Sequence, residues 1–106
     1  MPDLPVACSL TDPEFREREQ ALLARLRARI LEAMPEGEGW RLRVDGDDET
    51  LALVAEVISA ERQCCPFLRF DLRVTEGGGP VELLLSGPAG TREFIAPWFE
   101  PTVSGG

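Results

Sequence analysis

Pro66 separates two stretches of the chain that have different hydrophobic periodicity. Before it, apolar residues recur at the spacing of one helix face over residues 49–64, and after it apolar and polar residues alternate over 68–75. Proline disfavours the helical conformation for the preceding residue and donates no backbone hydrogen bond. We therefore predict a helix that ends near the adjacent cysteines Cys64 and Cys65, followed by a strand.

Capping signals and periodicity predict the elements before this junction. Thr11 and Glu14 have the spacing of a capping box, while Asp12 followed by Pro13 offers an alternative cap, and an apolar stripe at helical spacing follows. We expect an amphipathic helix from this point through about Met34. Apolar residues alternate with arginines over 40–44, which predicts a half-buried strand. The apolar segment at 6–10 is either an edge strand or a stretch that lies over the core.

Turn residues predict the elements after the junction. A glycine-rich turn at 77–80 leads into an apolar run at 81–85, which we expect to return antiparallel to the preceding strand. A short helix should follow over 91–96, because Pro97 stops it. The aromatic residues that we expect at the rim of the core are Trp98 and Phe99.

These elements predict an α+β protein. It should contain a mainly antiparallel sheet of three or four strands, with two longer helices and one short helix packed on one face. The 106 residues are enough for one domain with its own core, so we expect a single domain over 1–106. Residues 1–5 and 101–106 should be held loosely.

Composition narrows the classes of function. The net charge of −8, from 19 acidic and 11 basic residues, argues against nucleic acid and anionic membranes as partners. The sequence contains no histidine and no lysine, so a Ser-His-Asp triad, a Schiff base and a Cys2His2 zinc site are excluded. No apolar secretory segment begins the chain, and we expect a cytoplasmic protein with reduced thiols. We assign no catalytic residue, and binding is favoured over catalysis.

The adjacent cysteines are the strongest candidates for a functional site. Buried cysteine often serves as a small apolar residue, but packing gives no reason for two neighbouring thiols, whereas a thiophilic ion gains from converging sulfurs. Cys64 and Cys65 are the predicted primary ligands and Cys8 the third. Cys65 continues the buried stripe of its helix, so we expect Cys64, at the edge of that stripe, to be the more reachable thiol.

The donor set also favours some ions over others. Three sulfurs and no imidazole suit Hg(II), Cu(I) or As(III) better than structural zinc, which takes four ligands. For zinc, Glu61 or a second subunit would have to complete the coordination. The negative end of the helix disfavours a thiolate, while the neighbouring cations Arg62 and Arg69 favour it.

Two alternatives remain open. In a thiol redox protein, Cys64 would attack and Cys8 or Cys65 would resolve the mixed disulfide.

In an interaction or homodimerisation module, the cysteines would fill the core and an exposed surface would dock the partner. That surface would be the rim around the C-terminal aromatic residues or the outward arginines of the sheet, although cross-strand pairing with acidic side chains is the ordinary role of such arginines. The outward arginines are Arg41, Arg43, Arg69 and Arg73.

Three segments together resemble a known group of proteins. They are Ala7-Cys8-Ser9-Leu10, Glu61-Arg62-Gln63-Cys64-Cys65-Pro66-Phe67, and the stretch from Gly78 to Phe94 that contains Ser86-Gly87-Pro88-Ala89-Gly90. The chain resembles small bacterial proteins with this Glu-Arg-x-Cys-Cys-Pro-Phe motif, which are associated with mercury and other heavy-metal resistance loci. The resemblance implies a thiol-based metal role for Cys8, Cys64 and Cys65, without an established activity.

Overall fold

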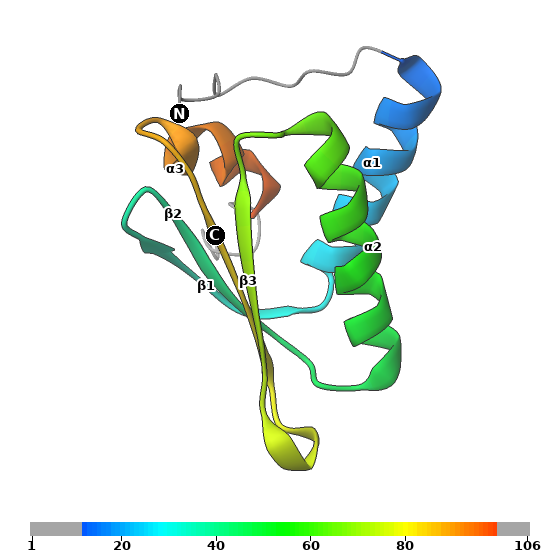
Figure 1. Cartoon of the computed structure of the whole chain (residues 1–106). Coiled ribbons are helices and arrows are strands. Elements are labelled where there is room, and N and C mark those ends of the chain that lie inside the picture. Colours follow the sequence, from blue (N-terminus) through cyan, green and yellow to red (C-terminus); the bar gives the residue numbers. More distant parts are fainter. Residues whose placement is uncertain (1–11, 100–106) are drawn as a thin grey trace.

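A four-stranded antiparallel sheet forms the frame of the computed structural model, which describes residues 12–99 (Figure 1). The strand order is β1-β2-β4-β3, and the helices pack on its apolar face. This arrangement confirms the predicted α+β class. In chain order the elements are α1 (Pro13–Arg27), β1 (Ile30–Glu36), β2 (Gly39–Val44), α2 (Asp48–Cys64), β3 (Arg69–Val74), η1 (Glu76–Gly78), β4 (Val81–Ser86), α3 (Thr91–Ile95) and η2 (Ala96–Trp98).

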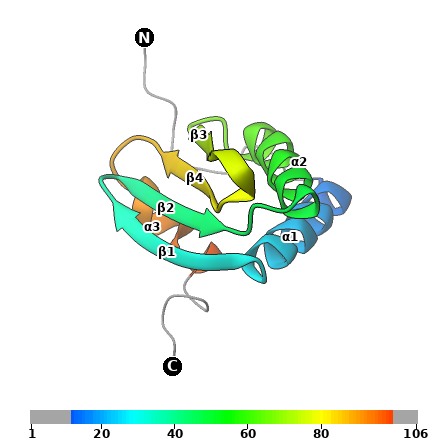
Figure 2. The same cartoon turned by 90° about the horizontal axis from the view of Figure 1, so that it is seen from below.

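The core lies between the inner face of the sheet and the helices. Trp40 and Leu42 of β2 stand opposite Leu85 and Leu83 of β4, and all four side chains are buried. The helices α1 and α2 run side by side along one side of the curved sheet, and α3 lies under β2 (Figure 2). They close the core with apolar side chains from three segments: Leu22, Leu23 and Leu26; Leu53, Val54 and Val57; Ile95, Ala96 and Phe99.

The end of the first helix differs from the sequence prediction. α1 ends at Arg27, and residues that we expected in its last turns form strand β1. The expected helix through about Met34 is therefore wrong. The physical reason is the tight turn between β1 and β2. Gly37 adopts a positive φ of 56° in this turn, which glycine accepts readily. The turn allows residues 30–36 to pair antiparallel with β2. Pro35 is tolerated in β1 because this strand lies at the sheet edge.

The remaining elements confirm the sequence predictions closely. The strand at 39–44, the helix ending at Cys64, the β3–β4 hairpin and the short helix α3 all lie where the patterns placed them. Pro97 lies inside the short η2 turn that continues α3. Phe99 is only 1% exposed and belongs to the core rather than to its rim. The predictions for 1–10 and 101–106 lie outside the described residues.

The outward arginines of the sheet pair with acidic side chains. Arg41 lies 3.7 Å from Glu36 and 3.8 Å from Glu82, and Arg73 also pairs with Glu82, at 3.8 Å. Arg43 contacts Glu32, and Arg69 contacts Asp71. Arg41, Arg43 and Arg73 thus form cross-strand ion pairs, as expected of such residues, whereas Arg69 pairs within its own strand β3. Each pair contributes at most about 1 kcal/mol at an exposed site.

Candidate thiol and carboxylate site

The C-terminal turn of α2 positions three candidate ligands. The backbone N–H of Cys65 donates to the carbonyl oxygen of Glu61 at 2.6 Å, which is the last helical hydrogen bond before Pro66 turns the chain into β3. Glu61 precedes Cys64 by three residues and Cys65 by four, so the three side chains emerge on the same side of the helix. The Cys-Cys-Pro sequence thus determines the local geometry of the site.

A fourth side chain reaches this turn from α1. The ligand atoms of Glu19, Glu61, Cys64 and Cys65 all lie within 4.8 Å of one another, and each of the four residues is at most 6% exposed. We call these four residues the thiol–carboxylate cluster. The sequence analysis identified three of them and missed Glu19. The available signal was an acidic residue on the apolar face of α1, four positions after Phe15 and three before Leu22.

The structure changes the expected accessibility of the two thiols. Cys64 is 1% exposed and Cys65 is 2% exposed, so the expectation that Cys64 is the more reachable thiol is wrong. The helix stripe does not decide this burial, because tertiary contacts also reach the turn: the Glu19 carboxyl of α1 lies within 4.8 Å of the Cys64 sulfur. Cys64 is also disulfide-bonded, contrary to the expectation of reduced thiols, whereas Cys65 is a free thiol. The predicted third ligand, Cys8, lies outside the described residues.

The cations near the site are not the expected ones. Arg62 is exposed, and Arg69 is exposed and paired with Asp71 across a distance of 3.2 Å. The positive charge that acts on Cys65 comes instead from Arg16 of α1, which lowers the pKa of that thiol. Arg16 lies one turn before Glu19, so α1 supplies both a carboxylate and a guanidinium to the site.

Burial keeps the Cys65 thiol protonated. Burial and the neighbouring Glu61 carboxyl raise the pKa of Cys65 to about 12, and Arg16 offsets only part of this rise. The Sγ–H group donates to Oε1 of Glu61, with 3.5 Å between the two heavy atoms. Because its pKa is raised to about 12, Cys65 is a neutral thiol and a poor nucleophile at neutral pH.

Glu61 is held in its neutral form for a similar reason. Burial, together with the adjacent Glu19 carboxyl, raises the pKa of Glu61 to about 9. Its buried Oε2 atom accepts no hydrogen bond from residues 12–99. The protonated Glu61 carboxyl instead shares a hydrogen bond with Glu19, which is one cause of its raised pKa.

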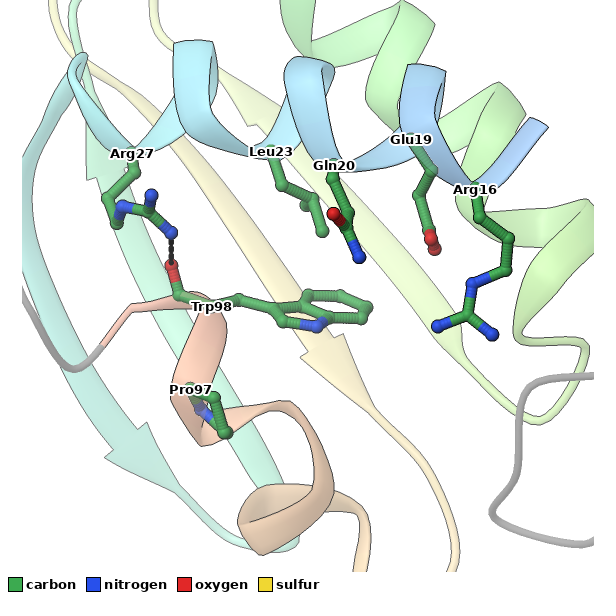
Figure 3. A pocket seen from close by; sticks show the side chains of 7 residues that line it. All are labelled: Arg16, Glu19, Gln20, Leu23, Arg27, Pro97 and Trp98. Atoms are coloured by element: carbon green, nitrogen blue, oxygen red, sulfur yellow. Dashed lines mark hydrogen bonds between the residues drawn. The ribbon is translucent and has the colours of Figure 1, made fainter. Parts of the chain in front are cut away.

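A cavity of about 400 Å³ adjoins the cluster (Figure 3). It opens between α1 and η2, and Glu19 belongs both to its lining and to the thiol–carboxylate cluster. The other lining residues are Arg16, Gln20, Leu23, Arg27, Pro97 and Trp98.

The fold and the site together define the class: an α+β protein with a buried thiol–carboxylate cluster beside a cavity. Comparison of the chain with family models, with curated proteins and with solved structures finds no significant match. No helix among the described residues is long and apolar enough to cross a membrane.

Proposed function

We propose that this protein binds a thiophilic metal ion of the Hg(II), Cu(I) or As(III) class through the reduced sulfurs of Cys64 and Cys65. Glu61 and Glu19 supply additional oxygen donors, and Cys8 is the proposed third sulfur. The observation that supports this function is the convergence of four buried donor atoms within 4.8 Å. A reducing cytoplasm is the proposed location, because it keeps both thiols available.

The donor types favour soft ions over zinc. The four donor atoms lie within 4.8 Å of one another, so one ion could contact both sulfurs. Thiolate sulfur prefers soft ions, which leaves zinc as the weaker candidate.

Metal binding also accounts for the buried polar atoms. An ion can displace the protons of Cys65 and Glu61, because its charge stabilises both anions where burial alone opposes them. The buried Oε2 atom of Glu61 would then gain a ligand contact. Because Cys64 is disulfide-bonded in the structure, binding of an ion by both sulfurs requires prior reduction of this bond.

Titration of the reduced protein tests this function. The protein would be reduced with a phosphine, freed of it and titrated with Hg(II) and with Cu(I) while the sulfur-to-metal charge-transfer absorbance is recorded. We expect saturation at one ion per chain, and loss of the band in the Cys64→Ser/Cys65→Ser variant. The same titration of an Arg62→Gln variant, which changes an exposed neighbour of the site, should match the wild type. An absent band, or an unchanged band in the double variant, contradicts the proposal.

One observation favours a second candidate, a thiol redox protein. Cys64 is disulfide-bonded and stands directly beside the free thiol of Cys65. Exchange between them requires a thiolate, however, and the raised pKa of Cys65, about 12, leaves very little of it at neutral pH. Redox titration with a dithiol buffer distinguishes the two candidates. A reduction potential near that of known thiol oxidoreductases, about −270 to −120 mV, together with rapid exchange, would favour the redox function.

A further inference from the structure

We propose that the cavity beside α1 binds a small thiol that carries a carboxylate, and that the metal ion reaches the cluster from a complex with this thiol rather than as a hydrated ion. This inference rests on the proposed function, because it names the form in which the ion is delivered. It is carried by the residues that line the cavity and by Glu19, which belongs to both the cavity lining and the cluster.

The cavity has the chemistry of a site for a small organic anion. Trp98 forms its floor, and Leu23, Gln20, Glu19 and Arg16 project from α1 toward it (Figure 3). The indole ring and Leu23 provide apolar surface for a short carbon chain. The Gln20 amide and the Arg16 guanidinium provide donors for a carboxylate, which guanidinium groups bind in bidentate geometry.

The two arginines of the cavity have different partners. Nη1 of Arg27 donates to the carbonyl oxygen of Trp98 at 3.4 Å, so this side chain supports the floor. Arg16 forms no ion pair with any acidic residue in the part of the chain that the structure describes. The protein has a net charge of −8, which repels anions in general. The exposed guanidinium of Arg16 attracts them locally, at the cavity.

The cavity and the cluster share one residue, Glu19. Glu19 lines the cavity, and its carboxylate lies within 4.8 Å of both sulfurs. Arg16, three positions before Glu19 on α1, lines the same cavity, and its side chain lies next to that of Glu19 (Figure 3). A complex held in the cavity by its carboxylate would therefore have its metal–sulfur bonds next to the buried thiols, which solvent scarcely reaches.

Delivery then proceeds by thiol exchange without a change of oxidation state. Each protein sulfur forms a bond to the ion as one bond from the ion to the small thiol breaks, and the proton of the protein thiol leaves on the departing thiol. For a two-coordinate Hg(II) complex, two such exchanges move the ion to Cys64 and Cys65 and release two small thiols. Glu19 and Glu61, beside the sulfurs, are placed to pass these protons outward.

The test compares two Hg(II) complexes that differ in charge. Reduced protein would be mixed with the bis-mercaptoacetate complex, which is anionic, or with the bis-2-mercaptoethanol complex, which is neutral and of similar size. Charge-transfer absorbance gives the transfer rate for each, and the ratio of the anionic to the neutral rate is compared among variants. We expect Arg16→Gln to lower this ratio by about tenfold, the effect of one charge-assisted contact, and Arg16→Lys to retain most of it.

Arg25→Gln is the matched control, because it removes the same charge from an exposed position of α1 outside the cavity. Equal losses in Arg16→Gln and Arg25→Gln, or no loss in Arg16→Gln, would overturn the inference while leaving the metal function intact. If the wild type accepts no ion from either complex or from free Hg(II), the proposed function fails and the inference fails with it. Thermal unfolding of each variant verifies that the fold is retained.

Discussion

The Cys65 thiol donates a hydrogen bond to Oε1 of Glu61, one helical turn earlier, in the buried space between α1 and α2. This contact links the two groups whose pKa values are raised most in the protein's candidate site. Both groups are therefore neutral at neutral pH, and an ion must displace both protons to bind them.

Glu61 should make stability depend on pH in a direction that can be checked. Its pKa is raised from 4.5 to about 9, so the folded protein holds a proton that the unfolded chain releases. The stabilisation that this bound proton gives to the folded protein is fully present below about pH 4.5, and it is lost as the pH rises toward about 9. We expect Glu61→Gln, which cannot titrate, to gain at least about 1 kcal/mol relative to the wild type between pH 5 and pH 9. Urea unfolding of the two reduced, metal-free proteins at several pH values measures this difference in stability. If the free energies of unfolding of wild type and variant change in parallel with pH, the prediction is contradicted.

Cys65 should be almost inert toward alkylation in the folded protein. In a Cys8→Ser/Cys64→Ser variant it is the remaining thiol, and burial combined with a pKa of about 12 suppresses the reactive thiolate. We expect iodoacetamide to react at least about a hundredfold more slowly at pH 8 than with the same variant in urea, where the thiol pKa is about 8.5. Comparable rates in the two states would instead support the redox function.

The core between β2 and β4 should be sensitive to cavities. Leu42 is fully buried opposite Leu83, so Leu42→Ala should lower the free energy of unfolding by about 2–5 kcal/mol. Leu31 of β1 is 51% exposed, and the same truncation there should change stability by no more than about 0.5 kcal/mol. Chemical denaturation of the two variants measures the difference. Similar losses at both positions would show that the register of β1 against β2 is different from the one described here.

Replacing either of two glycines in the β1–β2 hairpin by alanine should destabilise the protein, for a different physical reason in each case. Gly37 has open space around it but a φ of 56°, so Gly37→Ala should cost about 1–2 kcal/mol through backbone strain. At Gly39, a Cβ atom would meet the carbonyl oxygen of Leu85 on the neighbouring strand, which is backbone and cannot move aside. Gly39→Ala should therefore destabilise the protein more than Gly37→Ala, as thermal unfolding would show. The reverse order would contradict this account of the hairpin.

Part of the candidate site could be predicted from sequence because it is local. Glu61, Cys64 and Cys65 lie within one turn of a helix whose end is set by Pro66, so their common face follows from helical geometry. Glu19 and Arg16 could not be assigned in this way. Their place in the site depends on how α1 packs on α2, and an acidic residue on an apolar helix face has no unique partner in sequence.

The sequence by itself determined the elements whose periodicity and boundary residues agree: α2, the β3–β4 hairpin and β2, and with them the α+β class. Only the tertiary structure decided that residues 30–36 form a strand and not the end of a helix. Their apolar spacing is compatible with a helix, but pairing with β2 satisfies their backbone groups and completes the sheet, and this gain outweighs local propensity. Tertiary contacts also buried Cys64, because accessibility depends on what covers a residue and not on the residue's place along its own helix.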